Sequence, residues 1–437
     1  MAHQARQAAL EALRRCRRDG AWSAQAMDAA IKKYDLDRRD AALASRLVLS
    51  VLQNGEYLDY YVNLFCDKPI EPGLRELLRL GASQLLLTDR IPAHAAVGET
   101  VALCRANGYS RAAGLCNAVL RRLAENREHL PEIPGKGTAE YLHLRYSHPK
   151  WLAERIVNEH DYAFAEAFFQ KNNEPAPLTI QVNTLKVSAE DYGRALARQE
   201  IGFEAEAALP GCFTLPGGSV TALPGFAEGL FYVQDKAARA AVEIAAPEKG
   251  MRVLDACAAP GGKSFAAALR MADEGSILSR DLQEKKCARI REGAERLGLN
   301  CIETQAADAR VFQPELENAF DLVMADVPCS GLGVIGKRPE IRQKREEEIA
   351  ALPAIQAAIL ENVSHYVRPG GVLLYSTCTV LNAENSEQIH TFLQNNPNFQ
   401  AENFQLGSFA SQNGCYTFWP HIDGTDGFFV CKLRKTK

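Results

Sequence analysis

Long hydrophobic runs are absent from this chain of 437 residues. No segment approaches the roughly 18 consecutive apolar residues that can cross a bilayer, and residues 1–6 lead into no apolar run of the secretory type. The composition, 47% hydrophobic and 24% charged, is that of an ordinary globular protein. These features argue against secreted, membrane and disordered proteins, and we expect a cytoplasmic one. At about 100–200 residues per domain, the length predicts two to four domains.

Metal-binding cysteine motifs are also absent. The chain has 12 cysteines, but none are spaced as Cys-x-x-Cys, and its 9 histidines supply no second set of ligands. We therefore expect no metal. Free thiols in a large chain without an export signal indicate a reducing cytosol. Most of the cysteines are expected to be small core residues.

Neither positive nor negative charge dominates the chain, but the two are unevenly distributed along it. Residues 1–150 hold 22 Lys and Arg against 17 Asp and Glu, a net +5, so the remaining residues hold 28 against 37, a net −9. This asymmetry suggests that the first part contacts an anion such as RNA. Ordinary solvated helix faces explain it equally well.

The chain divides into three patterns. Residues 1–130 look entirely helical, with an apolar stripe at Leu74, Leu77, Leu78, Gly81 and Leu85. Two prolines and two glycines in residues 128–137 indicate a linker. Residues 140–235 mix strand and helix patterns, as in a small α/β module. Residues 236–437 alternate strand and helix patterns, which predicts a doubly wound α/β sheet.

Each strand-like run of residues 236–437 ends in an aspartate or a cysteine, side chains that can bind ligands or take part in catalysis. In parallel sheets ligands bind beyond the carboxyl ends of the strands. We therefore expect one crevice lined by the residues that end these runs: Asp255, Asp281, Asp308, Asp326 and Cys378.

The loop from Asp255 to Ser264 is a glycine-rich turn between a strand and a helix. It lacks the G-x-G-x-x-G pattern of dinucleotide sites. Gly262-Lys263-Ser264 matches the end of a P-loop, but Cys257 stands at the position of its first glycine. A third interpretation is a nucleoside cofactor without a polyphosphate, such as S-adenosylmethionine. Asp281 follows Gly262 at the usual interval of a ribose-binding carboxylate, and the set of carboxylates would repel phosphates, which favours this third interpretation.

Two thiols are expected in the same crevice, Cys329 after Asp326-Val-Pro and Cys378 within Ser376-Thr-Cys-Thr. Both could be buried small residues. The functional alternative is covalent catalysis on a pyrimidine, because C5 of cytosine takes a methyl group only after a thiolate has added at C6. Asp326 is close enough in sequence to Cys329 to stabilise the intermediate at the N3/N4 edge of the base.

Residues 255–263, Asp326–Gly331 and Ser376–Thr379 together resemble the RNA cytosine-C5 methyltransferases of the NOL1/NOP2/Sun family. The resemblance implies that Cys378 is the nucleophile and Cys329 releases the product, and that Lys263 lies near the target base. It also implies an S-adenosylmethionine site formed by Cys257, Ala258, Ala259, Pro260, Gly261, Gly262, Lys263, Asp281, Asp308 and Asp326.

The resemblance extends along nearly the whole chain. Arg145–Leu152 and Pro420–Phe429 look like the bacterial branch that methylates small-subunit ribosomal RNA. Residues 4–126, with Asp89–Pro92 and Asn117–Arg122, are similar to the NusB-like RNA-binding domain of that branch. The implied architecture is an all-α NusB-like bundle, an RNA-recognition-like module and a Rossmann-like catalytic domain.

Two departures from the family pattern are Gln181, where many members have Arg, and Gly336–Pro339, where relatives are often more basic.

The resemblance implies that the partner is small-subunit ribosomal RNA, unassembled or partly assembled, and we expect a monomer. Transfer RNA is an alternative substrate. A non-catalytic RNA-binding protein and a nucleoside triphosphatase are the alternative classes.

Overall fold

The computed structural model describes residues 2–89 and 91–437, which form two compact units. Unit 1 comprises residues 2–174 together with the segment 335–346, and unit 2 comprises residues 175–334 and 347–437. Arg90, part of the Asp89–Pro92 motif, lies outside the described residues.

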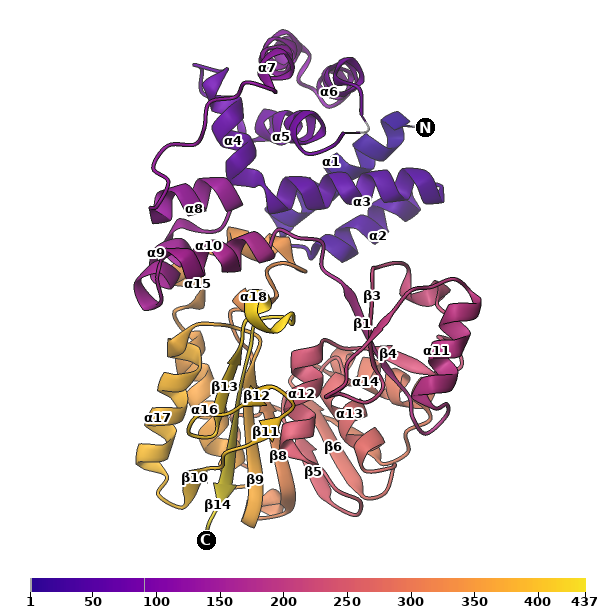
Figure 1. Ribbon diagram of the computed structural model, residues 1–437, viewed down its shortest axis with the longest axis vertical. Helices are drawn as coiled ribbons and strands as arrows, with labels where there is room; N and C mark the ends of the chain where they lie inside the picture. The colour runs from indigo at the N-terminus through magenta and orange to yellow at the C-terminus, as the bar shows by residue number, and fades with distance from the viewer. Residues whose placement is uncertain (1, 90) are drawn as a thin grey trace. The chain divides into compact units, whose positions relative to one another are not determined.

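Unit 1 is entirely helical among its described residues (Figure 1). Its helices are α1 (Ala2–Asp19), α2 (Ser23–Lys33), α3 (Arg38–Gln53), α4 (Gly55–Leu64), α5 (Pro72–Leu86), α6 (Ala93–Ala106), α7 (Ala113–Asn126), α8 (Ala139–Tyr146), α9 (Lys150–Glu159) and α10 (Tyr162–Lys171), with short 3₁₀ turns η1 (Ser110–Ala112) and η5 (Pro339–Gln343).

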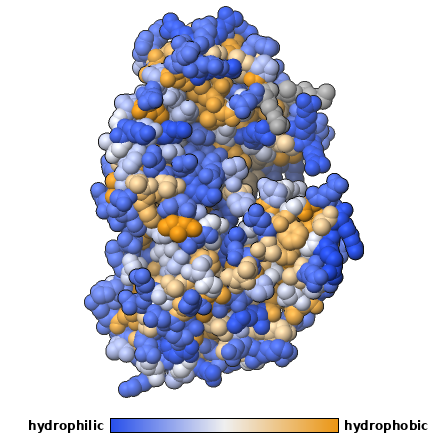
Figure 2. All heavy atoms as spheres, in the orientation of Figure 1, coloured by the Kyte–Doolittle hydropathy of each residue, from blue (hydrophilic) through white to orange (hydrophobic). Residues whose placement is uncertain are grey.

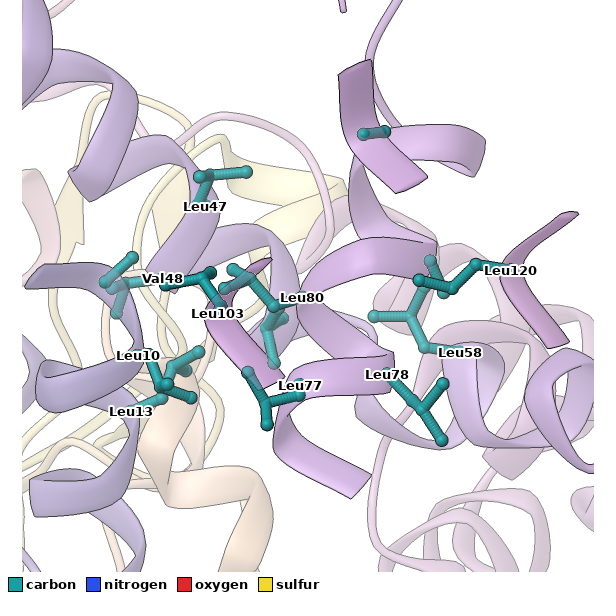
Figure 3. Packing of buried hydrophobic residues seen from close by; sticks show 14 of the residues in the cluster. Leu10, Leu13, Leu47, Val48, Leu58, Leu77, Leu78, Leu80, Leu103 and Leu120 are labelled. Atoms are coloured by element: carbon teal, nitrogen blue, oxygen red, sulfur yellow. The ribbon is translucent and has the colours of Figure 1, made fainter. Parts of the chain in front are cut away.

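The predicted apolar stripe on α5 is confirmed, since all of its residues are buried. Figure 3 shows Leu77, Leu78 and Leu80 of this helix among leucines of its neighbours. A Cβ on Gly81 would lie 2.6 Å from Leu120 Cδ1, so glycine lets α5 and α7 approach closely. Burial of such leucines contributes roughly 2 kcal/mol each, which explains why the bundle forms.

Two expectations for unit 1 change. Not all of the excess positive charge of residues 1–150 is available to an anion, because on α1 Arg17 pairs with Glu76 and Arg14 donates to Asn107 Oδ1 at 2.8 Å. Residues 128–137 are irregular, as expected of a linker, but Ile133 is buried in the bundle core.

The small sheet of unit 2 has the strand order β2-β3-β1-β4, with all pairs antiparallel. Its strands are β1 (Leu178–Val182), β2 (Glu204–Ala205), β3 (Cys212–Leu215) and β4 (Phe231–Val233), covered by α11 (Ala189–Arg198); a 3₁₀ turn, η2 (Val220–Ala222), precedes β4. Gln181 is buried here and donates to Gln234 O at 3.1 Å and Cys212 Sγ at 3.2 Å. Its amide therefore forms hydrogen bonds inside the small α/β module.

The large sheet has the order β10-β14-β9-β8-β5-β6-β7, with β13 paired to β14. Its strands are β5 (Arg252–Asp255), β6 (Ser276–Asp281), β7 (Ile302–Ala306), β8 (Phe320–Asp326), β9 (Val367–Thr377), β10 (Phe399–Ala401), β13 (Cys415–Phe418) and β14 (Phe428–Lys435), and a separate hairpin joins β11 (Gln405–Leu406) to β12 (Phe409–Ala410). The five strands β9-β8-β5-β6-β7 are parallel, as predicted.

Helices cover both faces of the large sheet. One core joins it to α12 (Lys236–Ala245), α13 (Gly262–Arg270) and α14 (Glu284–Leu297). The other joins it to α16 (Leu352–Ser364) and α17 (Ser386–Asn395). The remaining elements are α15 (Glu346–Ile349), α18 (Pro420–Asp423) and the turns η3 (Pro314–Leu316), η4 (Leu332–Val334) and η6 (Asn382–Glu384). This three-layer arrangement confirms the Rossmann-like prediction.

Candidate active site

The parallel strands bring the predicted acidic residues to one edge of the sheet. Asp255 ends β5, Asp281 ends β6 and Asp326 ends β8, where it lies opposite Ser376 of β9. Burial raises the pKa of the Cys257 thiol, and the negative charges of Asp255, Asp326 and Asp281 raise it further. The three carboxylates therefore surround Cys257, as the positions of the strand ends predicted.

The loop after β5 is held by buried hydroxyl groups. Ser264 Oγ donates to Asp255 Oδ2 at 2.7 Å and lies 2.7 Å from Ser279 Oγ. Asp255 Oδ1 is buried without a hydrogen-bond partner, and burial raises the pKa of this carboxyl to about 7. A buried acceptor without a donor is costly unless something donates to it. The loop thus contains one buried acceptor, Asp255 Oδ1, to which a bound ligand could donate a hydrogen bond.

Gly261 and Gly262 let this loop pack closely against its neighbours. The φ of Gly261 is +108°, a conformation that favours glycine, and a Cβ there would lie 2.5 Å from the Phe265 ring. On Gly262, a Cβ would lie 3.3 Å from Gln234 Nε2. The two glycines therefore allow a tight turn into the N-terminus of α13. The carboxylates beside this turn fit a cofactor that has hydroxyl and amino groups.

Asp281 and Asp308 differ in their surroundings. Asp281 is buried and accepts from Gln283 N at 3.3 Å, with Lys286 Nζ 3.4 Å away. Asp308 lies just beyond β7 and binds Arg310, whose hydrogen bonds lower the pKa of this carboxyl to about 2. Asp308 is thus ionised at neutral pH, but Arg310 already occupies part of its hydrogen-bonding capacity.

The two predicted thiols are in contact. Cys329 Sγ lies 3.2 Å from Cys378 Sγ, although 49 residues separate them, and both side chains are half-buried. The hydrogen bond to Cys378 and burial raise the pKa of the Cys329 thiol well above its ordinary value. The two sulfurs are therefore close enough to share a hydrogen bond, in which either can be the donor.

An ion pair lies beside the thiols. Lys263 Nζ contacts Asp326 Oδ2 at 2.6 Å, and Ser376 Oγ donates to Asp326 Oδ1 at 2.8 Å. The Lys263 ammonium also lies over the Phe428 ring, 5.0 Å from its centre. Asp326 thus links the loop after β5 to the strand that carries Cys378. The predicted pair of Lys263 and Asp326 is brought together.

Several contacts that hold the thiols were not expected from the sequence. Gly333 N donates to Cys378 O at 3.0 Å, and Gly427 N donates to Gly333 O at 2.8 Å. A Cβ on Gly333 would lie 1.8 Å from Gly427 O, so only glycine allows this approach. Gly427 belongs to the Pro420–Phe429 motif, which was the one sequence indication of this contact. Glu384, which accepts from Ser330, had no such indication.

The same motif also reaches the surface. It begins with α18, over which Figure 2 shows an apolar spot, and Ile422 of this helix is 62% exposed. The motif therefore combines an internal contact near Cys378 with an exposed apolar side chain.

No helix among residues 2–89 and 91–437 is long and apolar enough to span a membrane. The same residues contain no group of three or more His, Cys, Asp or Glu side chains suited to hold a metal ion.

Comparison with family models matches all three regions of the chain. Residues 3–125 match the NusB family, residues 148–221 match the ferredoxin-like domain of RsmF/B-like methyltransferases, and residues 242–434 match the 16S rRNA methyltransferase RsmB/F model.

Curated relatives match over nearly their whole length. The probable ribosomal RNA small subunit methyltransferase B of Bacillus subtilis is 34% identical over 98% of both chains. Ribosomal RNA small subunit methyltransferase B of Serratia proteamaculans is 35% identical over 91% of both.

Solved structures share the fold. The crystal structure of PH0851 superposes with a TM-score of 0.84 at 26% identity, covering 99% of both chains. A methyltransferase homologue from Pyrococcus horikoshii superposes with a TM-score of 0.59 at 27% identity, covering 67% of this chain and 97% of its own.

Proposed function

The chain belongs to the family of ribosomal RNA small subunit methyltransferase B, and we propose that it methylates C5 of a cytosine in 16S ribosomal RNA through a covalent cysteine adduct. The observation that carries this proposal is the 3.2 Å contact between Cys329 and Cys378 beside the Lys263–Asp326 pair. S-adenosylmethionine is the cofactor, and when bound it supplies the methyl group.

The cofactor would be bound by the loop Cys257–Lys263 and by the carboxylates Asp281, Asp308 and Asp326. The tight turn at Gly261 and the unpartnered Asp255 oxygen support this assignment. In the same site, carboxylates suit a cofactor that is cationic at sulfur and carries ribose hydroxyls, since they accept hydrogen bonds and would repel phosphates.

Cys378 begins the reaction. After its proton has passed to solvent, its sulfur forms a bond to C6 of the cytosine, and the C5–C6 double-bond electrons make C5 nucleophilic. Negative charge then develops at the N3 edge of the base. The Lys263 ammonium, which the Asp326 carboxylate holds at 2.6 Å, can donate a hydrogen bond to this edge and stabilise the charge.

Cys329 completes the reaction. Once C5 carries the methyl group, the Cys329 thiolate, whose own proton has passed to solvent, takes the C5 proton, the C5–C6 double bond forms again, and the C6–S bond breaks to return the Cys378 thiolate. The contact between the two sulfurs supports this division, because both must reach adjacent carbons of one ring. The target base must leave its stack to enter the site, so an unpaired cytosine is expected.

We further propose that the protein acts in the cytoplasm as a monomer on ribosomal RNA that is unassembled or partly assembled. The NusB-like bundle supports RNA contact outside the catalytic domain. A buried cytosine in a finished subunit would be out of reach of a crevice at a sheet edge.

The test is methyl transfer from labelled S-adenosylmethionine to purified 16S ribosomal RNA and to transfer RNA, each followed by bisulfite sequencing. One 5-methylcytosine in 16S ribosomal RNA is expected. Methylation confined to transfer RNA would replace the proposed substrate. If calorimetry detects no S-adenosylmethionine binding, the chain is an RNA-binding protein and the catalytic proposal is wrong.

A further inference from the structure

Glu384 is a buried carboxylate, 2% exposed, that lies six residues beyond Cys378 in the turn η6. An ionised carboxylate is stable in the interior only if donors surround it. Here the donors are Ser330 N at 2.9 Å, Ser330 Oγ at 2.5 Å and Gln356 Nε2 at 2.8 Å. Glu384 therefore takes its hydrogen bonds from the residue that directly follows Cys329.

The same contacts continue to the Cys378 loop. Ser330 Oγ lies 2.7 Å from Thr379 Oγ1, the residue after Cys378. Gln356 also donates to Pro328 O at 3.0 Å, on the other side of Cys329. The backbone on both sides of Cys329 is thus connected to Glu384, and one side of Cys378 is connected through a single hydroxyl.

Asn385 holds the Cys378 loop directly. Thr377 Oγ1 donates to Asn385 Oδ1 at 2.6 Å, and Asn385 Nδ2 donates to Thr379 O at 3.1 Å. The residues on both sides of Cys378 are therefore bound to the neighbour of Glu384. Two adjacent side chains in one turn fix the loops of both thiols.

We propose that Glu384 is a positioning residue that holds the two thiols in contact and, by its negative charge, makes Cys329 the more basic sulfur, so that Cys329 is suited to take the C5 proton and Cys378 to attack C6. This inference rests on the proposed function for the roles of the two thiols. It extends that function to a residue that touches neither substrate nor cofactor.

The charges around Glu384 support the second part of the proposal. The negative charge of Glu384 acts on two titratable groups, Cys329 and Tyr375, and the Tyr375 hydroxyl donates to Glu384 O at 2.7 Å. The element α16 presents the neutral Gln356, and Glu387 of α17 is exposed. After the Cys378 contact and burial, the negative charge of Glu384 is the next cause that raises the pKa of Cys329.

The charge is tested by alkylation of Cys329 with iodoacetamide as a function of pH, followed by mass spectrometry of the Cys329 peptide. The full chain is compared as Cys378→Ser and as Cys378→Ser with Glu384→Gln, so that only Cys329 of the pair reacts. Removing a nearby like charge should move the midpoint of alkylation to lower pH by about one unit. An unchanged or higher midpoint would overturn the proposal.

Glu387→Gln, three residues further on and exposed, is the matched control and should leave the midpoint unchanged. The positioning part is tested by Glu384→Ala against Glu384→Gln in the otherwise intact chain. The glutamine can still accept from Ser330, so it should retain most of the rate of adduct formation, whereas alanine should lose at least tenfold. Equal rates in the two variants would contradict positioning.

The alkylation assay uses neither RNA nor S-adenosylmethionine. A failure of this inference therefore leaves methylation intact, and a failure of methylation leaves the alkylation result interpretable.

Discussion

Two pairs of cysteines in the catalytic domain are in contact, and only one of them lies in a setting suited to catalysis. Cys329 and Cys378 follow the carboxyl ends of β8 and β9, 3.2 Å apart, with Lys263 and Asp326 beside them. Cys415 and Cys431 lie opposite each other on the antiparallel strands β13 and β14, 2.6 Å apart. The second pair packs against an apolar core.

The difference shows that proximity of two thiols does not make a site. Burial raises the pKa of Cys431 well above its ordinary value, as the hydrogen bond to Cys378 and burial do for Cys329, so a raised thiol pKa does not separate the two pairs. The two cations of β14 near this pair, Lys432 and Arg434, both form ion pairs with Glu402. In the crevice, partial exposure and a polar edge make the first pair reachable by a base.

The largest expected effect comes from Cys378→Ala, which removes the sulfur that bonds to C6. Methylation should be lost, while S-adenosylmethionine binding measured by calorimetry should stay near that of the wild type. Cys431→Ala is the matched change in the second pair and should cost about 1 kcal/mol of stability without loss of turnover. Undiminished turnover of Cys378→Ala would remove the nucleophile from this position.

Cys329→Ala should stop the reaction after methyl transfer, because no base remains to take the C5 proton. The expected result is a covalent protein–RNA complex that survives a denaturing gel. Cys415→Ala should give no such band. If Cys329→Ala turns over without accumulating the complex, the two thiols do not divide the work as proposed.

Lys263→Met keeps the aliphatic chain but removes the ammonium that contacts Asp326. Loss of a group that donates a proton or hydrogen bond in the transition state lowers rates by about 10²-fold or more, so kcat should fall by about that factor. Lys432→Met breaks a comparable pair, 2.8 Å from Glu402, and should leave kcat within about twofold. Equal effects of the two variants would show that Lys263 acts only through stability.

The smallest effect concerns stability as a function of pH. Asp255 has a pKa of about 7 in the folded chain, against about 3.9 when unfolded. The folded state therefore keeps a proton that the unfolded state loses between pH 4 and 7, and the free energy of unfolding falls as pH rises through this window. Asp255→Asn should remove this fall, about 2 kcal/mol between pH 5 and 8 in urea titrations.

Glu402, near the Cys415–Cys431 pair, should affect the free energy of unfolding with the opposite pH dependence. Hydrogen bonds from Arg434 lower its pKa to about 2, so its contribution to stability is present above pH 4 and is lost as the pH falls towards 2. Glu402→Gln should therefore weaken the fold at neutral pH and not at pH 2. If Asp255→Asn and Glu402→Gln change the pH dependence of the free energy of unfolding in the same direction, the contrast between the two regions is wrong.

Much of this site could be predicted because strand ends meet in a parallel sheet. The alternation of strands and helices placed Asp255, Asp281, Asp326 and Cys378 at one edge, and the structure brings them there. Asp308 was predicted to line the same crevice, and the sequence did not indicate that Arg310 binds it, since a side chain two residues away can turn back onto it. Such local competition has no periodic pattern in the sequence.

Periodicity and residue type act locally, so the classes of element, the Rossmann-like order and the residues available for chemistry at the crevice could be predicted before the fold was known. The folded chain was needed to find that Cys329 and Cys378 are in contact, that Glu384 and Asn385 hold both thiol loops, and that Arg17 of α1 turns inward to Glu76. These outcomes depend on contacts between residues up to 59 positions apart, such as Arg17 and Glu76, and on burial, which changes the energy of a charge and is defined only once the chain has folded.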